Sequence, residues 1–87
     1  MMQQIVNTII EQYPGLESIY LYGSYARNEQ TEQSDIDIQV MMPKGTFVRR
    51  YDLALNQTLT ALTGKDVHVV FATIPNQWCI KKLYPDA

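Results

Sequence analysis

The alternating stretch "DIDIQV", which begins at Asp35, constrains the fold of this chain more than any other. Successive side chains of a strand point to opposite faces, so the stretch predicts a strand with its isoleucines and valine on one face and Asp35, Asp37 and Gln39 on the other. Strands disfavour aspartate, and two carboxylates on one face repel each other unless a cation lies between them. The polar face therefore carries either two solvated aspartates or a divalent metal site.

Apolar spacing and turn residues predict the other elements of the fold. Helical periodicity indicates a first helix, and β-branched and aromatic runs indicate two more strands. Thr46 is a candidate N-cap and Gly64 a candidate C-cap of the longest helix, and Pro75 suits the first turn of a last one. The predicted helices are 2–13, 46–64 and 75–84, the predicted strands are 18–23, 35–42 and 66–72, and residues 24–30 allow one further helical turn.

This order of elements predicts an α/β fold in which about three strands are covered by helices. A chain of 87 residues is expected to form one domain, 1–87, with a single modest core. No apolar run approaches the roughly 18 residues of a membrane span. The N-terminal residues lack a signal-peptide pattern and Cys79 is the lone cysteine, so we expect a cytoplasmic protein.

Charge argues against nucleic acid as a direct partner. The chain carries 7 basic and 9 acidic residues, a formal net charge of −2, so it has no overall positive field to hold phosphates. Two small basic pairs, Arg49-Arg50 and Lys81-Lys82, are expected to be solvated helix faces.

The stretch that follows the first predicted strand offers groups that suit phosphate. Gly23 allows a tight turn and close approach of a ligand to the backbone, and Ser24 offers a hydroxyl at the start of the next helical turn. Arg27 adds a cation one turn later. A simple strand-ending turn explains "GS" equally well when it stands alone. Next to an aspartate pair, the same turn predicts a triphosphate cradle facing a metal site.

These residues together resemble a known motif. Gly23-Ser24, then Ala26-Arg27, then Ser34-Asp35-Ile36-Asp37 have the spacing of the DNA polymerase β-type nucleotidyltransferase superfamily, and the chain is similar to its minimal members along nearly its whole length. The resemblance implies a mixed sheet flanked by helices and transfer of a nucleoside monophosphate from an NTP, expected to be ATP, to a hydroxyl group.

The resemblance also assigns roles to single residues. It implies that Asp35 and Asp37 bind Mg²⁺, that Gly23 and Ser24 hold the β- and γ-phosphates, and that Arg27 and Ser34 are further contacts on the nucleotide side. Small members of the superfamily are often antitoxins encoded beside a HEPN-domain toxin, and some add AMP to a tyrosine of that toxin. A HEPN-type protein is therefore the expected partner, with assembly into a hetero-oligomer.

The chain departs from the superfamily pattern at the third acidic residue. The corresponding stretch is "KDVHVVF", in which either Asp66 or His68 occupies that position, depending on the alignment of the strand. Both residues are predicted to share one strand face. A neutral imidazole can accept a proton, whereas Mg²⁺ prefers the oxygen of Asp66. A structural role is about equally expected for each of them.

Three functional hypotheses follow. The first is a Mg²⁺-dependent adenylyltransferase that modifies a hydroxyl of a partner toxin. The second is an antitoxin with weak or no catalysis that neutralises its partner by binding. The third is a small-molecule nucleotidyltransferase of the aminoglycoside type, which is less favoured because the sequence offers no second domain to form that pocket.

Overall fold

The structure is a computed structural model that describes residues 1–46, 49–73 and 81–85. Its elements, in chain order, are α1 (Met2–Gln12), β1 (Ser18–Tyr22), β2 (Ile36–Met41), α2 (Leu53–Thr63), β3 (Val67–Ala72) and β4 (Lys81–Tyr84). The predicted first helix and the three predicted strands are confirmed, each to within one residue at either end.

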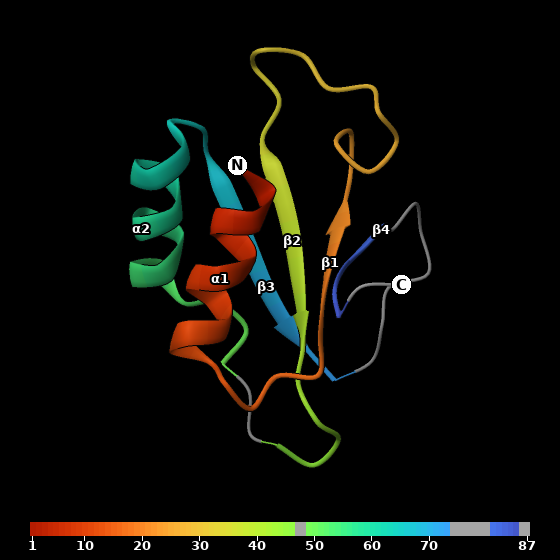
Figure 1. The fold of residues 1–87 in the computed structure, drawn as a ribbon, viewed down its shortest axis with the longest axis vertical. Coiled ribbons are helices and arrows are strands. Elements are labelled where there is room, and N and C mark those ends of the chain that lie inside the picture. Colours follow the sequence, from red (N-terminus) through yellow and green to blue (C-terminus); the bar gives the residue numbers. More distant parts are fainter. Residues whose placement is uncertain (47–48, 74–80, 86–87) are drawn as a thin grey trace.

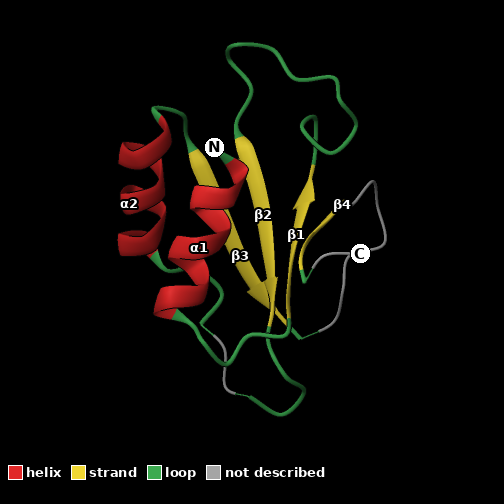
Figure 2. Cartoon of the chain, in the orientation of Figure 1, coloured by secondary structure: helices red, strands yellow, loops and turns green. Residues whose placement is uncertain are grey.

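The strands form one mixed sheet in the order β3-β2-β1-β4. β2 pairs in parallel with β3 and antiparallel with β1, and β4 adds to the other edge of β1, again antiparallel. Both helices pack against this sheet, with α2 beside β3 (Figures 1 and 2). The predicted α/β fold is confirmed, with four strands where about three were expected.

The core lies between the two helices and one face of the sheet. The apolar face of β2 is fully buried there, as the alternation of its sequence predicts. The helices contribute isoleucine, valine and leucine side chains to the same cluster. The buried residues of this core are Ile5, Val6, Ile9, Ile19, Leu21, Ile36, Ile38, Val40, Leu55, Leu59, Val67, Val69 and Phe71.

The opposite face of β2 is accessible only at one end. Asp35 is exposed and Asp37 is half-buried, as a polar face requires. Gln39 and Met41, further along the same face, are 7% and 5% exposed. Gln39 is therefore a buried member of the polar face, and the accessible part of this face of β2 is confined to the two aspartates.

The helix predicted from Thr46 begins later, at Leu53, with Asp52 as its N-cap. The Asp52 side chain accepts a hydrogen bond from the Leu55 backbone N–H at 3.0 Å, while the Arg50 carbonyl accepts one from the Phe71 N–H at 3.1 Å. Pairing with β3 therefore competes with helix formation before Asp52. At the other end, Gly64 has φ 74° and is the left-handed C-cap that the sequence predicts.

The outer edge of β3 is protected by groups from α2 and the segment before it. The N–H of Val67 donates to Thr60 Oγ1 at 3.2 Å, and that of Val69 donates to Asn56 Oδ1 at 3.0 Å. With the Phe71 bond, these contacts satisfy alternate backbone donors along the edge. Such coverage prevents a bare edge strand from pairing with other chains.

The prediction of a final helix over 75–84 is wrong in its last part, where Lys81–Tyr84 forms β4; residues 74–80 lie outside the described part of the chain. Lys81 and Lys82 lie opposite Leu21 and Tyr20 of β1, and Leu83 and Tyr84 pack against the core. The backbone bonds offered by the edge of β1 outweigh the local helical pattern.

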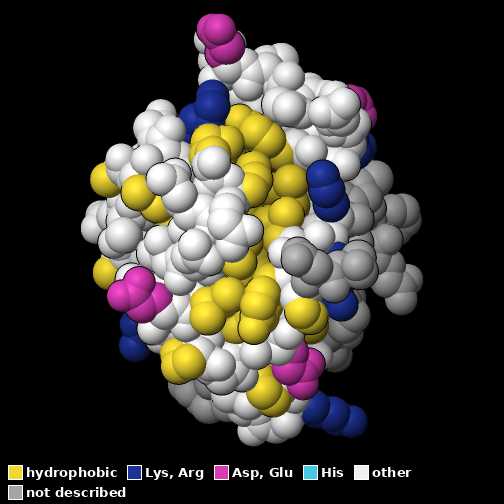
Figure 3. Space-filling model, viewed as in Figure 1, with side chains coloured by type: hydrophobic (Ala, Val, Ile, Leu, Met, Phe, Trp, Pro, Cys, Tyr) yellow, Lys and Arg dark blue, Asp and Glu magenta, His cyan; other side chains and the backbone are white. Residues whose placement is uncertain are grey.

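The face that bears the helices leaves some apolar surface uncovered. Figure 3 shows a strip of hydrophobic side chains running lengthwise down this face. A pocket between α1 and β4 is lined by Val6, Ile10, Leu83 and Tyr84 among others. Within the described ranges, neither helix has the length and hydropathy needed to cross a bilayer.

A hydrogen bond between Tyr13 and Asp52 joins the end of α1 to the start of α2. This bond, with the Leu55 N–H, holds the pKa of the Asp52 carboxyl below its ordinary value. A lowered carboxyl pKa adds stability that is present above about pH 3.9 and is lost as the pH falls through the folded-state pKa. The Tyr13 ring also contacts Phe71, at 4.7 Å between centroids.

We therefore expect Tyr13→Phe to lower the free energy of unfolding by about 1 kcal/mol at pH 7, because it removes the hydrogen bond and keeps the ring. Urea denaturation at pH 7 and at pH 3 measures the effect, and the difference from wild type should shrink at the lower pH. A difference that is the same at both values would show that the bond to ionised Asp52 is not its cause.

Candidate functional site

The candidate site lies where three neighbouring strands place Gly23, Asp37 and His68 in one row. Tyr22, the last residue of β1, is in register with Asp37 on β2, and Asp37 is in register with His68 on β3. Gly23 follows Tyr22 directly. Because neighbouring strands lie about 4.8 Å apart, Asp37 is flanked by the glycine turn on one side and by the imidazole on the other.

The Asp37 carboxylate lies close to the backbone of Gly23. Gly23 has φ +76°, and a Cβ atom placed on it would lie 2.7 Å from Asp37 Oδ2. A side chain at this position would therefore displace the carboxylate as well as strain the backbone. The sequence predicts close approach of a ligand to the backbone at Gly23, which stays a prediction; the structure shows in addition that the Asp37 carboxylate lies there.

A single helical turn follows Gly23, as predicted, and ends at Asn28. The Asn28 N–H donates to the Tyr25 carbonyl at 3.3 Å, and the Glu29 N–H donates to the Ser24 carbonyl at 2.9 Å. With Asn28 at φ 60°, this is the Schellman arrangement that ends many helices. Asparagine tolerates the left-handed conformation better than most residues, which suits it to this position.

The two aspartates differ in their surroundings. Burial raises the pKa of the Asp37 carboxyl above its ordinary value, the neighbouring His68 acts in the opposite direction, and Asp35 raises it further. Asp35 is about half exposed, and its Oδ2 lies 3.5 Å from His68 Nε2. The Asp37 carboxylate is thus partly desolvated, whereas the Asp35 carboxylate is exposed to solvent beside the His68 imidazole.

The three other residues predicted on the nucleotide side have different environments. Arg27 Nε donates to Glu29 Oε1 at 3.0 Å on the surface, and such exposed pairs are weak enough to exchange for a ligand. Ser34 Oγ accepts from the Thr31 N–H at 2.8 Å and closes the loop before Asp35. The Ser24 hydroxyl has no partner among the residues that the structure describes.

The backbone of Asp66 lies beside the backbone of Asp35, just before the paired strands β3 and β2 begin. The Asp66 carbonyl accepts from the Ile36 N–H at 2.9 Å, and Lys65 Nζ donates to the Glu32 carbonyl at 3.2 Å, which ties the polar loop to the turn before β3. Asp35 and Asp66 line a common pocket of about 280 Å³. Both candidates for the third position, Asp66 and His68, therefore adjoin Asp35, and which of them completes the site stays a prediction.

The donor set fits a hard cation such as Mg²⁺. Asp35 and Asp37 supply carboxylate oxygens on one strand face, and the absence of a side chain at Gly23 leaves room against Asp37. In the ranges that the structure describes, no cluster of three or more His, Cys, Asp and Glu side chains is arranged to hold a metal.

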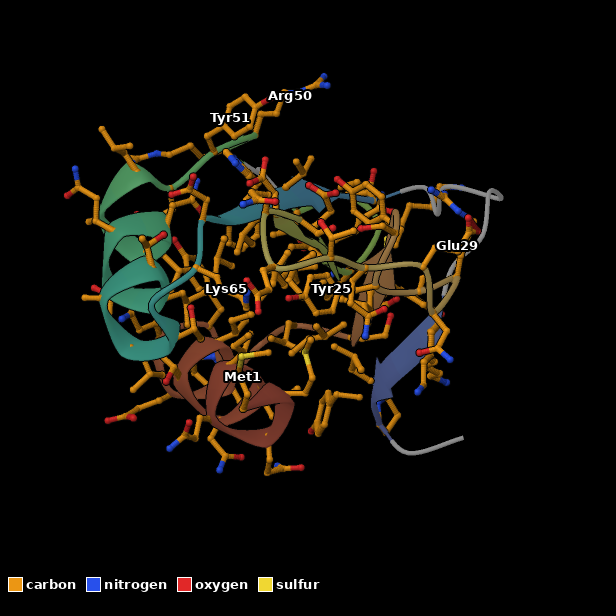
Figure 4. The ribbon with its side chains drawn as sticks, turned by 90° about the horizontal axis from the view of Figure 1, so that it is seen from above. Met1, Tyr25, Glu29, Arg50, Tyr51 and Lys65 are labelled. Atoms are coloured by element: carbon orange, nitrogen blue, oxygen red, sulfur yellow. The ribbon has the colours of Figure 1, made fainter. Side chains whose placement is uncertain are left out.

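Three further residues on this face of the sheet, Tyr22, Arg50 and Tyr51, were not predicted from the sequence. Burial raises the pKa of the Tyr22 hydroxyl, Asp37 and Tyr51 add to the increase, and Arg50 opposes it, so these groups lie close enough to interact. Figure 4 shows Arg50 and Tyr51 on the side of the sheet away from α1. Tyr22 could have been identified from its position just before Gly23, but Arg50 and Tyr51 were assigned to a helix.

Residues 3–83 match the family described as Polymerase beta, Nucleotidyltransferase. The chain belongs to this family, since the match covers nearly all of it and the fold and the aspartate pair agree. Among curated relatives, MJ0128 of Methanocaldococcus jannaschii, assigned as a protein adenylyltransferase, is 37% identical over 90% of this chain and 80% of its own length. The protein adenylyltransferase MntA of Shewanella oneidensis is 35% identical over 77% of this chain.

Solved structures of toxin–antitoxin pairs are similar as well. A chain of an MntA-HpeT mutant complex, in which two aspartates two positions apart are changed to glutamate, aligns with a TM-score of 0.78 at 26% identity, over 97% of this chain and 73% of its own. A chain of a toxin–antitoxin crystal structure with AMP-PNP gives 0.70 at 33%, over 80% and 56%. A chain of a complex of tri-AMPylated Shewanella oneidensis HEPN toxin with MNT antitoxin gives 0.55 at 32%, over 87% and 60%.

The chain spans only part of several of these proteins. The aligned region covers 48% of the length of MntA and 56% of the matched chain in the AMP-PNP structure. The sequence and the fold of this shared region establish the family of the chain.

Proposed function

We propose that this protein transfers AMP from ATP to a side-chain hydroxyl of a HEPN-type partner protein, as the antitoxin of a toxin–antitoxin pair in the cytoplasm. The observation that supports the proposal is the proximity of Gly23 to the Asp37 carboxylate, whose Oδ2 lies 2.7 Å from where a Cβ atom on Gly23 would be. The turn predicted to bind phosphate therefore adjoins the predicted metal ligand. The relatives named adenylyltransferases, and the similar structures with AMP-PNP and with an AMPylated HEPN toxin, support the same reading.

In this proposal each residue has a distinct task. Asp35 and Asp37 would hold Mg²⁺, and Gly23 and Ser24 would hold the β- and γ-phosphates, with Arg27 and Ser34 as secondary contacts. The bound ion would neutralise charge on the triphosphate and stabilise the leaving pyrophosphate. The position of Gly23 limits how far the phosphates can lie from Asp37, so the turn orients the nucleotide relative to both carboxylates.

The proposal is tested by calorimetry with ATP and Mg²⁺, together with a transfer assay that uses labelled ATP and a HEPN-type protein from the same organism. We expect saturable, Mg²⁺-dependent nucleotide binding and labelling of the partner. Binding of the partner without any binding of ATP would reject the enzymatic reading.

A second function, neutralisation of the partner by binding alone, is favoured by one specific feature. His68 is in register with Asp37 on β3 and lies beside Asp35, where the superfamily resemblance leads one to expect an acid. Imidazole is a poor ligand for Mg²⁺. An antitoxin of this kind would form the same complex without modifying its partner.

We expect Asp66→Asn to slow AMP transfer by a factor between ~10 and 100, the range seen when groups that support a metal site are removed, and His68→Ala to have an effect of only a few fold. The reason is that the asparagine keeps the shape of the side chain and loses the negative charge that attracts a metal. Initial rates of labelling, with nucleotide at saturation, measure both variants. The opposite ranking would assign the third position to His68.

A further inference from the structure

The outer face of α2 is open to solvent and carries no charge. It includes two leucines, Leu53 and Leu62, which are 69% and 45% exposed. In Figure 1, α2 lies at the flank of the sheet beside β3, on the far side from β4. We propose that this α2 face binds a second copy of this chain, as an antiparallel helix pair with two-fold symmetry. Such pairing needs no nucleotide and goes beyond the proposed function. The exposed residues of the α2 face are Leu53, Ala54, Gln57, Thr58, Ala61 and Leu62.

The lack of charge on α2 is typical of a surface that is covered. Surface helices usually turn charged and polar residues to water, yet none of the 11 residues Leu53–Thr63 is charged. Charged residues are depleted in the cores of protein interfaces, because a buried charge without a partner is costly. Near a two-fold axis a charged group would also meet the same charge on the second copy. An uncharged face therefore suits a second copy of this chain.

The order of residues along α2 has the symmetry that such a pair needs. If the two-fold axis passes between Gln57 and Thr58, residues at equal distances from the axis lie level with each other on the two antiparallel helices. Every exposed residue of α2 is then level with an exposed residue, and each apolar one with its own type. The level pairs are Leu53 with Leu62, Ala54 with Ala61, and Gln57 with Thr58.

The charges that border α2 favour the antiparallel direction. Asp52 precedes the helix and Lys65 follows it. Antiparallel pairing brings the end that carries Asp52 alongside the end of the second copy that carries Lys65, so opposite charges adjoin at both ends. The positive end of each helix dipole also lies beside the negative end of the other. A parallel pair would place like charges and like helix ends together.

A pocket between α2 and the start of β3 matches the more exposed leucine. It has a volume of about 430 Å³, and Leu53, Gln57, Thr60 and Ala61 contribute to its lining. Because successive helical residues are about 100° apart, these four lie on one side of the α2 face. The two-fold axis preserves that side, so Leu53 of the second copy lies level with Ala61 and over the pocket. Each copy thus offers a leucine to the pocket of the other, as a self-complementary interface requires.

The pocket also includes Asp66 and His68 of the candidate site. Leu53 of the second copy would therefore lie beside both candidates for the third position of that site. A contact made mainly by single helices is smaller than the roughly 800 Å² per partner of a standard interface, so we expect a weak dimer with a dissociation constant on the order of 100 µM.

Sedimentation equilibrium of the full chain, from about 10 µM to about 1 mM, measures this constant. The average mass should rise with concentration from the 10.0 kDa of one chain toward twice that value. Ala54→Glu should raise the dissociation constant at least about tenfold, because the carboxylate would be buried against Ala61 of the second copy. Combining Ala54→Glu with Ala61→Lys should restore it to within about threefold of wild type, because each carboxylate then meets an ammonium group.

Asn7→Glu is the matched control for the added charge. Asn7 is exposed on α1 and lines the pocket between α1 and β4, away from α2. This variant should dimerise as wild type does. Circular dichroism verifies that each variant is folded.

Isotope-filtered NMR tests the same contact in the wild-type chain, without any substitution. In an equal mixture of labelled and unlabelled chain, NOEs should connect the methyl groups of Leu53 with that of Ala61 on the other copy. NOEs confined to another surface would overturn the proposal. So would a chain that stays monomeric throughout, equal dimerisation of wild type and Ala54→Glu, or a folded double variant no better than Ala54→Glu alone. None of these results depends on ATP binding, so the proposed function is tested separately.

Discussion

Gly23→Ala is expected to reduce AMP transfer about a hundredfold, the loss that accompanies a displacement of reacting groups by roughly 1 Å. The added Cβ atom would come within 2.7 Å of Asp37 Oδ2, which forces either the carboxylate or the turn to move. ATP binding should weaken in parallel, because the same movement separates the phosphate-binding turn from the carboxylates. Calorimetry with ATP and Mg²⁺, beside the transfer assay, measures both effects.

Gly64→Ala is the matched control for this substitution. Gly64 has φ +74°, close to the +76° of Gly23, but a Cβ atom there meets nothing within 4 Å. Both variants should lose about 1 kcal/mol of stability from the left-handed backbone, and only Gly23→Ala should lose nucleotide binding. Equal losses of binding in the two variants would reduce the role of Gly23 to that of a turn residue.

Replacing both aspartates, Asp35→Asn with Asp37→Asn, should abolish Mg²⁺-dependent ATP binding and slow transfer on the order of a thousandfold or more. A bound metal supplies several kcal/mol of stabilisation to the transition state, and each 1.36 kcal/mol is a factor of ten in rate. The amides keep the shape of the side chains and cannot replace their charge. Unchanged ATP binding in this variant would contradict the assignment of the metal ligands.

The same variant should be at least as stable as the wild-type protein without ligands. The raised pKa of Asp37 means that ionisation of this carboxyl opposes folding at neutral pH. Its removal should raise the free energy of unfolding by roughly 0.2–1 kcal/mol, the scale of a cross-strand pair. Because the wild-type carboxyl is neutral at low pH, the gain should disappear below about pH 3.9. Urea denaturation across this range separates loss of function from loss of fold.

Elements with a strong local signal were predicted accurately from the sequence. The alternation at "DIDIQV" located β2, and Gly64 located the end of α2. The failures occurred where contacts distant in sequence decide the structure. Lys81–Tyr84 is a strand because the edge of β1 is available to it, and the segment before Leu53 stays extended because Arg50 bonds to Phe71. Local propensity contains no information about either partner.

The candidate site was predictable to the extent that it follows a linear motif. Gly23 and Asp37 were proposed from the turn, the strand alternation and the motif, and the structure places them close together. Their neighbours Tyr22 and Arg50 were not identified, because their positions depend on strand register and on a segment that was assigned to a helix. The pocket between α2 and the start of β3, which His68 lines, was not predictable either, because it is formed by two elements that pack against each other.

The most direct test of this account is labelling of a HEPN-type protein from the same organism with AMP from labelled ATP. Wild type and the double variant with Asp35→Asn and Asp37→Asn would be compared with and without Mg²⁺, after complex formation with the partner is verified for each. The account predicts labelling by wild type with Mg²⁺ and none by the double variant. A wild-type protein that binds both ATP and the partner yet transfers no label would contradict it and favour neutralisation by binding.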